Sequence, residues 1–128
     1  LVGLVVVSHS NKLAEEVINF AKLLQQEEFK IENGGDINQK VYGATVDTIK
    51  DAIRRADEGQ GVLVFVDMGS SIFNAAKAVE DIKEEVEIAD APLVEGIISA
   101  VAANFDEMSL SELKEIAEGS RNFKKIKK

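Results

Sequence analysis

Leu4-Val5-Val6-Val7 and Val62-Leu63-Val64-Phe65-Val66 are the two stretches that decide the fold. Both are short, continuously apolar and rich in β-branched residues, which is typical of strands buried on both faces of a parallel sheet. Two weaker runs, Phe29-Lys30-Ile31 and Val86-Glu87-Ile88-Ala89, alternate apolar with polar residues. We therefore predict four strands, with the alternating pair nearer the edges of the sheet.

Segments with the apolar spacing of amphipathic helices separate and follow these runs. The first begins at Ser10 or Asn11, either of which is a plausible N-cap. Two further helices are expected at about 45–57 and 71–85. A fourth helix is expected to hold Pro92 in its first turn, and a fifth, at 109–119, begins with a capping box. The predicted buried faces are Leu13, Val17, Phe20 and Leu24; Ile49, Ala52, Ile53 and Ala56; Ile72, Ala75, Ala76, Val79 and Ile82; and Val94, Ile97, Ile98, Val101 and Ala102.

The alternation of strands and helices predicts an α/β fold, an open and mainly parallel four-stranded sheet with helices on both faces. We expect the strand order 2-1-3-4, counted along the chain. With 128 residues, the chain is expected to form one domain, since domains commonly hold about 100 to 200 residues. Residues 33–43 form a long connection, in which Gly34-Gly35 is either a mobile lid or simply a turn.

The chain is acidic and its charge is unevenly distributed. It has 15 Lys and Arg against 23 Asp and Glu, a net charge of −8. Residues 121–128 hold five basic groups and no acid, which leaves −13 on residues 1–120. This is the opposite of the basic footprint of a nucleic-acid binder, so neither nucleic acid nor an anionic membrane is expected as a partner. We expect the basic tail, residues 120–128, to be a solvated end.

Cysteine is absent, which excludes disulfides, thiolate metal sites and a thiol nucleophile. No stretch approaches the roughly 20 apolar residues that cross a bilayer, and residues 2–7 lack the basic leader of a signal peptide. We therefore predict a cytoplasmic protein without a membrane span. The start at Leu1 suggests that an initiator methionine is missing from the sequence.

His9 and Asp67 are the candidate catalytic residues. Asp67 directly follows one of the two buried strands and His9 lies two residues after the other. In open parallel sheets ligands bind beyond the carboxyl ends of the strands where the strand order reverses. A neutral imidazole is nucleophilic near pH 7, and a carboxylate can fix which ring nitrogen keeps its proton. His9, the only histidine, is therefore predicted to accept a phosphoryl group beside Asp67.

Helix N-terminal amides near these strand ends would bind the phosphoryl oxygens. The serines after Asp67 could donate to phosphate or could simply form a turn and helix cap. The predicted phosphate-binding set from these segments is Ser10, Asn11, Gly69, Ser70 and Ser71.

Other chemistries lack their sequence signatures. The chain has no G-x-S-x-G nucleophile elbow, and no P-loop or dinucleotide fingerprint. One histidine without cysteine makes a zinc site improbable, and a receiver domain would need an acidic cluster where Ser8-His9-Ser10 stands. Neither a metal nor a cofactor is expected, although a magnesium site made only of carboxylates at Asp67 stays open without a sequence signal in its favour.

Three segments resemble the mannose-type enzyme IIA domains of the sugar phosphotransferase system, and more narrowly the phosphocarrier subunits of phosphotransferase-dependent dihydroxyacetone kinases. The resemblance covers about residues 2–105. The segments are Leu4-Val5-Val6-Val7-Ser8-His9-Ser10-x-Lys12-Leu13-Ala14-Glu15, Val62-Leu63-Val64-x-Val66-Asp67-Met68-Gly69-Ser70-Ser71 and Asp90-Ala91-Pro92-Leu93-Val94-Glu95-Gly96.

The resemblance implies that His9 receives phosphate from the phosphohistidine of HPr, with Asp67 as the adjoining carboxylate. The phosphate would pass to ADP held by the subunit DhaL, which with DhaK phosphorylates dihydroxyacetone. Family members carry Gly-Thr at the start of the second helix, whereas this chain has Gly43-Ala44-Thr45, so Thr45 would contribute its hydroxyl from one position later. Glu16 replaces a glycine common in the family and is expected to be exposed.

Two other functions stay open. The chain could be a sugar-specific enzyme IIA that passes phosphate to a separate IIB domain for transport, or a regulatory module that binds without catalysis. A homodimer is expected from the resemblance and from the open sheet edges. Met68, Ile72 and Phe73 are the candidates for the centre of a docking surface beside the crevice, and the alternative is that at least two of them belong to the core.

Overall fold

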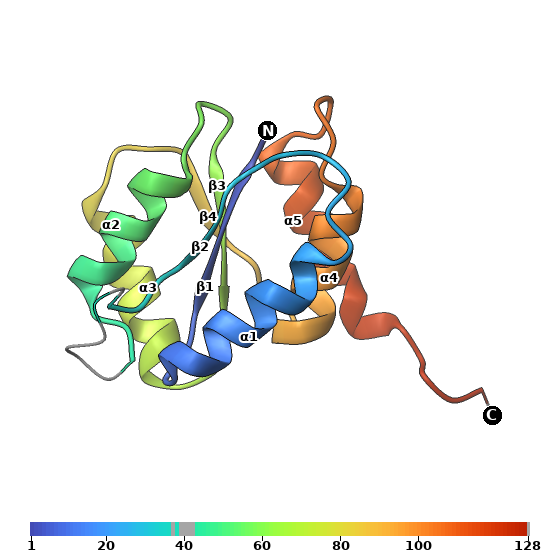
Figure 1. Ribbon diagram of the computed structural model, residues 1–128, viewed down its shortest axis with the longest axis horizontal. Helices are drawn as coiled ribbons and strands as arrows, with labels where there is room; N and C mark the ends of the chain where they lie inside the picture. The colour runs from blue at the N-terminus through green and yellow to red at the C-terminus, as the bar shows by residue number, and fades with distance from the viewer. Residues whose placement is uncertain (37, 39–42, 128) are drawn as a thin grey trace.

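A four-stranded parallel sheet forms the centre of the protein, in the order β2-β1-β3-β4 (Figure 1). The computed structural model describes residues 1–36, 38 and 43–127. β1 (Gly3–Val7) and β3 (Val62–Val66) pair along their full length, with Gly3 opposite Val62 and Val7 opposite Val66. β2 (Ile31–Asn33) and β4 (Val86–Ile88) are the short edge strands. The predicted α/β fold class and strand order are confirmed.

Helices follow the strands in the predicted order and cover both faces of the sheet. They are α1 (Asn11–Lys22), α2 (Val46–Ala56), α3 (Ser70–Asp81), α4 (Leu93–Ala103), α5 (Leu110–Gly119) and a final 3-10 turn η1 (Ser120–Asn122). In Figure 1, α2 and α3 lie on one side of the sheet, and α1, α4 and α5 lie on the other.

Successive residues of β1 point to opposite faces of the sheet, so each strand contributes to two cores. Leu4 and Val6 join the core under α1, α4 and α5, together with Phe65. Val5 and Val7 join the core under α2 and α3. All five are at most 1% exposed, which explains why the strand is apolar throughout rather than alternating.

Gly3 marks where α2 ends against the beginning of β1. A Cβ atom at Gly3 would lie 2.1 Å from the carbonyl oxygen of Ala56, the last residue of α2. No side chain can occupy that space, because real Cβ atoms do not approach backbone oxygen so closely. Glycine at this position therefore permits the close contact between helix and strand.

Helix capping agrees closely with the prediction. Ser10 is the N-cap of α1, and its hydroxyl accepts a hydrogen bond from the Leu13 amide. Ser109 forms the predicted capping box with Glu112 at the start of α5. Pro92 takes the N-cap position of α4, one residue before the first turn in which it was expected.

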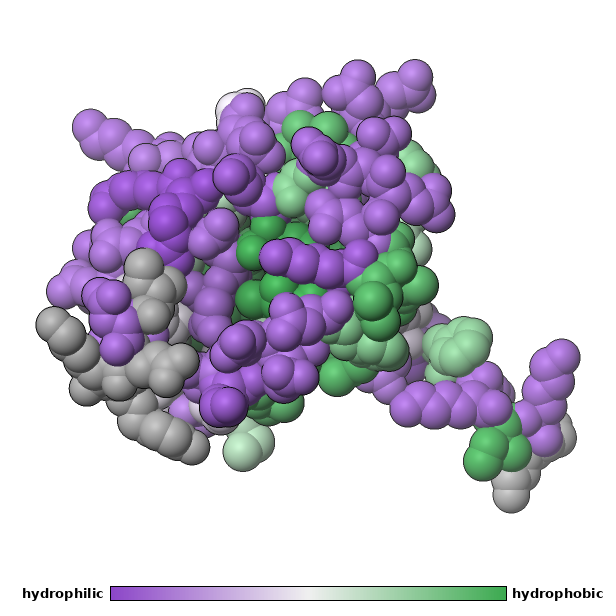
Figure 2. Space-filling model, in the orientation of Figure 1, coloured by the Kyte–Doolittle hydropathy of each residue, from purple (hydrophilic) through white to green (hydrophobic). Residues whose placement is uncertain are grey.

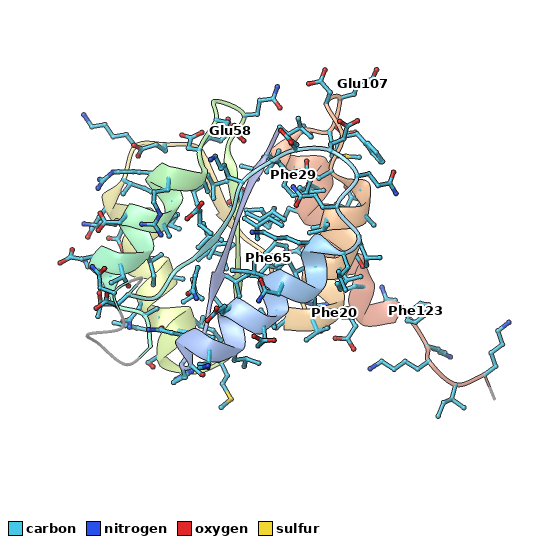
Figure 3. All side chains as sticks on the ribbon, viewed as in Figure 1. Phe20, Phe29, Glu58, Phe65, Glu107 and Phe123 are labelled. Atoms are coloured by element: carbon cyan, nitrogen blue, oxygen red, sulfur yellow. The ribbon has the colours of Figure 1, made fainter. Side chains whose placement is uncertain are left out.

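The predicted buried face of α1 is wrong by one position. Leu13, Phe20 and Leu24 are 45%, 52% and 42% exposed, and of the expected stripe only Val17 is buried. Figure 3 shows Phe20 on the outside of the molecule, whereas Phe65 lies between the sheet and the helices. The residues that face the sheet are Ala14, Val17, Ile18 and Ala21. Small alanines bring the helix axis close to the strands and turn the larger side chains toward solvent.

The buried faces of α3 and α4 also differ from the prediction. Ile72 and Ala76 of α3 are exposed, as are Val94 and Ala102 of α4. In both helices alanine, serine or glycine supplies part of the contact with the sheet, so the large apolar residues do not mark the core face. The buried residues are Ser71, Ala75 and Ala78 in α3, and Gly96, Ile97, Ala100 and Val101 in α4.

The observed boundaries of several strands and helices differ from the predicted ones. β2 begins at Ile31, two residues after the predicted start, and includes Asn33. α3 ends at Asp81, four residues early, because the chain turns into extended backbone at Ile82. Of the connection predicted at 33–43, residues 37 and 39–42 lie outside the described residues. In the described part Gly34 is buried, and its amide donates to the carbonyl of Val6, the strand residue beside it.

The basic C-terminal segment is solvated as expected, since residues 121–127 are exposed, but two ion pairs also connect it to the body. Arg121 pairs with Asp90 at 3.0 Å, and Lys125 pairs with Glu95 at 2.7 Å. The Glu95 ion pair raises the pKa of Lys125 and lowers that of Glu95. Beyond Arg121, Phe123 projects into solvent (Figure 3) and is 73% exposed.

Hydrophilic side chains cover most of the face seen in Figure 2, broken by a hydrophobic area over α1 and α4. Glu16 is exposed as predicted. None of the helices in the described part of the chain combines the length and apolar character needed to span a bilayer.

Candidate functional site

The carboxyl ends of β1 and β3 bring His9 and Asp67 together. The Asp67 amide donates to the carbonyl of Val7, which extends the pairing of the two strands by one step. The next residues of each chain segment then leave the sheet at the same edge. His9 Nδ1 lies 3.1 Å from Asp67 Oδ1, with the two side chains 41% and 16% exposed.

The Asp67 carboxylate accepts hydrogen bonds at both oxygens. Oδ2 lies 3.0 Å from the backbone nitrogen of His9 and 2.9 Å from the Ser8 hydroxyl. Oδ1 lies 2.6 Å from the Met68 amide, besides its contact with the imidazole. Burial on its own would raise the pKa of Asp67, but bonds from the His9 amide, Ser71, the Met68 amide and Ser8 outweigh it and hold that pKa well below its usual range.

An ionised Asp67 fixes the tautomer of His9. A carboxylate without a proton can only accept, so the hydrogen of a neutral imidazole must sit on Nδ1, the nitrogen that faces Asp67. Nε2 then carries the free lone pair. The geometry therefore presents Nε2 as the nucleophilic atom of the site.

The start of α3 lies against the other side of the imidazole. The Ser70 hydroxyl is 2.9 Å from Nε2, and the Ser71 hydroxyl is 3.2 Å from Nδ1. Gly69 adopts φ +55°, and a Cβ there would lie 3.7 Å from Nε2. Positive φ favours glycine, and Gly69 is the N-cap of α3, so the N-terminus of this helix, which favours anions, lies beside the imidazole.

The remaining predicted phosphate-binding residues have other bonding partners. The Ser10 hydroxyl caps α1, and the Asn11 amide group donates to the Asp36 carbonyl at 3.4 Å. Thr45 is the N-cap of α2, where it forms a capping box with Thr48. Gly43 approaches the His9 backbone: a Cβ there would lie 3.0 Å from the His9 carbonyl oxygen. This segment borders the site through its backbone, while the Thr45 hydroxyl accepts a hydrogen bond from the Thr48 amide in the cap of α2.

Ser8 is a site residue that the sequence analysis did not single out. Its hydroxyl bonds to Asp67, and the residue is 2% exposed. The sequence offered one signal, since Ser8 directly follows β1, as Asp67 directly follows β3. That signal does not say whether the hydroxyl points toward Asp67 or into the core.

A hollow of about 240 Å³ adjoins Asp67 on the side of β4. It is lined by Val66, Asp67, Ile72, Ile88, Ala89, Asp90 and Ala91.

Three large apolar side chains lie exposed at the beginning of α3: Met68, Ile72 and Phe73 are 67%, 48% and 72% exposed. In the described part of the chain, no cluster of three His, Asp or Glu side chains could hold a metal ion.

Comparison with protein families identifies the chain. Residues 3–118 match the EIIA-man family, which is described as the PTS system fructose IIA component. The chain belongs to the EIIA-man family. The match extends from β1 through α5 and so includes both strand ends that carry His9 and Asp67.

Curated relatives of this EIIA-man chain are phosphoryl donor subunits. It is 34% identical over 110 residues to "PEP-dependent dihydroxyacetone kinase, phosphoryl donor subunit DhaM" of Escherichia coli strain K12, which covers 80% of this chain and 23% of that protein. A DhaM of Providencia stuartii is 28% identical over 120 residues, 88% of this chain and 25% of that protein. The chain thus spans about a quarter of the length of these two relatives.

A shorter relative matches over most of its own length. The "PEP-dependent dihydroxyacetone kinase 2, phosphoryl donor subunit DhaM" of Listeria innocua is 30% identical over 104 residues, which is 78% of this chain and 83% of that protein. The crystal structure of a protein of unknown function, EF1359, has the same fold, with a TM-score of 0.78 and 24% identity over 91% of this chain and 92% of that one.

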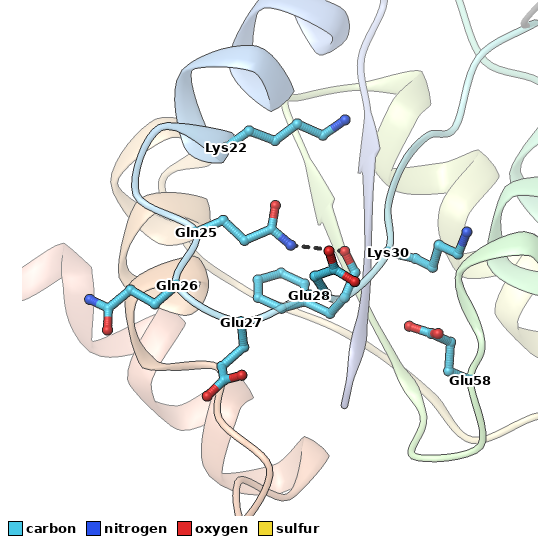
Figure 4. Close-up of a pocket in the computed structure, with 8 residues that line it drawn as sticks. Lys22, Gln25, Gln26, Glu27, Glu28, Lys30 and Glu58 are labelled. Carbon is cyan, nitrogen blue, oxygen red and sulfur yellow. Dashed lines mark hydrogen bonds between the residues drawn. The ribbon is translucent and has the colours of Figure 1, made fainter.

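A second and larger hollow in this EIIA-man chain lies near the C-terminal end of α1. It measures about 670 Å³ and is lined mainly by polar residues of 22–30 and by Glu58 (Figure 4). The Gln25 side chain crosses it to donate to the Phe29 carbonyl at 2.9 Å. His9 and Asp67 are not among its lining residues, so this hollow is separate from the candidate site.

Proposed function

We propose that this chain is a phosphocarrier of a dihydroxyacetone kinase, with His9 as the residue that receives and releases the phosphoryl group. The observation that supports this most strongly is the pairing of His9 Nδ1 with an ionised Asp67, which leaves Nε2 beside Ser70 at the N-terminus of α3. Family membership and the names of the curated relatives point in the same direction.

The proposed transfer moves one phosphoryl group between two imidazoles. The Nε2 lone pair of His9 attacks the phosphorus of a donor phosphohistidine, the new N–P bond forms, and the donor N–P bond breaks with its electrons returning to the donor ring. The Nδ1 hydrogen stays in place, where Asp67 balances the positive charge that develops on the imidazole. Because such transfer passes through a loose in-line transition state, the site acts mainly by alignment and by stabilising charge on the phosphoryl oxygens.

Gly69, Ser70 and Ser71 are proposed as the residues that receive those oxygens. The Ser70 hydroxyl, now beside Nε2, would turn to donate to a phosphoryl oxygen once that lone pair is used. Ser10, Asn11 and Thr45 stay predicted contributors at the rim of the same site.

We propose HPr as the donor and ADP bound to DhaL as the acceptor. In the second step a β-phosphate oxygen of ADP attacks the phosphorus, the His9 N–P bond breaks, and ATP forms on DhaL for use with DhaK. The partner would supply the nucleotide and Mg²⁺, since this chain has no nucleotide-binding motif. The surface made by Met68, Ile72 and Phe73 would contact these partners.

A transfer assay tests the acceptor. The chain is labelled with phospho-HPr, separated, and mixed with DhaL·ADP or with a IIB domain. We expect rapid loss of label only to DhaL·ADP, and no heat of binding when ADP and Mg²⁺ alone are added to the chain. Loss of label only to IIB would support the sugar-transport function instead, and failure to take up label would indicate a regulatory module.

We also propose that the chain forms a homodimer. Two kinds of surface could be covered by a second copy: the open edges of the sheet, and the exposed apolar residues of α1 and of the turn after it, namely Leu13, Phe20, Leu23 and Leu24. Light scattering at micromolar concentration should give twice the mass of 13.9 kDa. A monomer mass under these conditions would refute this proposal while leaving the phosphocarrier role untouched.

A further inference from the structure

Ser8 occupies the point where β1 passes into the site, behind His9 and away from solvent. It is 2% exposed, whereas the imidazole of His9 is 41% exposed. A buried hydroxyl needs hydrogen-bond partners, and Ser8 has two. Its oxygen lies 3.0 Å from the backbone nitrogen of Ser10 and 2.9 Å from Asp67 Oδ2.

The direction of both bonds follows from the chemistry of the groups. The Ser10 amide can only donate, so the Ser8 oxygen accepts from it. The ionised Asp67 can only accept, so the single hydroxyl hydrogen of Ser8 must point at Oδ2. Ser8 therefore links the N-terminus of α1 to the carboxylate through one continuous chain of donors, from the Ser10 N–H through the Ser8 O–H to Asp67.

This arrangement sets the orientation of the carboxylate. Ser8 and the His9 amide both hold Oδ2, from the β1 side of the site. With Oδ2 fixed, rotation of the carboxylate is restrained and Oδ1 points at His9 Nδ1. We propose that Ser8 is a positioning residue for phosphoryl transfer, which keeps Asp67 aimed at His9 and thereby keeps the lone pair of His9 on Nε2. This inference rests on the proposed function of His9.

The Ser8 hydroxyl also contributes to the low pKa of Asp67, together with bonds from the His9 amide, Ser71 and the Met68 amide. The titratable groups near the carboxylate are His9, from the junction of β1 and α1, and Asp90, which lines the same hollow after β4. Removing one donor should therefore raise the Asp67 pKa without abolishing its link to the imidazole.

The test compares Ser8→Ala with Ser8→Thr, which keeps a hydroxyl. As a matched control, Ser99→Ala removes a hydroxyl whose 2.8 Å bond to the Glu95 carbonyl lies within α4, outside the site. In Ser8→Ala we expect phosphoryl uptake from phospho-HPr to slow by about tenfold, as outer partners of a site often contribute. Ser8→Thr should recover most of that loss, and Ser99→Ala should match the unsubstituted protein.

Two spectroscopic measurements separate positioning from a purely structural role. Carbon-13 NMR should show the Asp67 carboxyl titrating at higher pH in Ser8→Ala, and nitrogen-15 NMR of His9 should show a smaller fraction of hydrogen on Nδ1. Unchanged Asp67 titration and His9 tautomer in a folded Ser8→Ala protein would overturn the inference. If the unsubstituted protein takes up no phosphate, the proposed function fails, and the NMR results still decide whether Ser8 orients Asp67.

Discussion

Replacing His9 with alanine should abolish phosphorylation of the chain by phospho-HPr. His9 is the only histidine in the sequence, and its Nε2 lies 2.9 Å from the Ser70 hydroxyl at the N-terminus of α3. The unsubstituted protein should acquire one phosphate that is labile in acid and stable in base, as a phosphoramidate is. Intact-protein mass spectrometry and phosphorus-31 NMR would measure both properties.

The His9→Ala protein should remain folded. The imidazole is 41% exposed and lies outside both hydrophobic cores, so its removal creates little buried cavity. Circular dichroism and urea unfolding provide the control for folding. A folded His9→Ala protein that still takes up an acid-labile phosphate would show that His9 is not the acceptor.

Replacing Asp67 with asparagine should slow phosphoryl uptake by about 100-fold or more, the scale on which catalytic positioning acts. The asparagine side chain has nearly the same shape but carries no charge, and its NH2 group cannot accept the hydrogen bonds that both carboxylate oxygens now receive. His9 would lose the partner that fixes its tautomer. Stopped-flow or quench-flow transfer from phospho-HPr measures the rate, and an unchanged rate would make the carboxylate incidental.

The same substitution should change how stability depends on pH. The folded-state pKa of Asp67 is lowered, so its contribution to stability is present in full above the unfolded pKa of about 3.9. That contribution is lost as the pH falls below this value toward the folded pKa. Between pH 6 and pH 3 the free energy of unfolding should therefore drop less in Asp67→Asn than in the unsubstituted protein. Equal drops in urea titrations would contradict this account of Asp67.

Much of the fold could be predicted from the amino-acid sequence. Two continuous β-branched runs and two alternating ones predicted four parallel strands and their order, which the structure confirms. The physical reason is that burial of both sheet faces leaves no polar position in the central strands. The capping patterns at Ser10 and Ser109 were equally informative, because they depend on hydrogen bonds within one turn of the helix.

The sequence was less informative about which helix faces are buried, since a pattern of residues predicts burial only from the size and polarity of the side chains. Leu13 and Phe20 were expected inside and lie outside, whereas Ala14 and Ala21 face the sheet. The distance between helix and strand decides which is buried, and that distance depends on the packing of the whole layer.

The candidate site was likewise predicted only in part from the sequence. Sequence alone indicated His9 and Asp67, because each follows a buried strand and parallel strands end at one edge of the sheet. The hydrogen bonds around these two residues depend on contacts between distant parts of the chain. The register of β1 against β3 places Val7 beside Val66, and so brings the Ser8 hydroxyl and the His9 amide to the Asp67 carboxylate, from residues 59 and 58 positions away in the chain. Contacts at such separation follow from the pairing of whole strands, which no local pattern around Ser8 can specify.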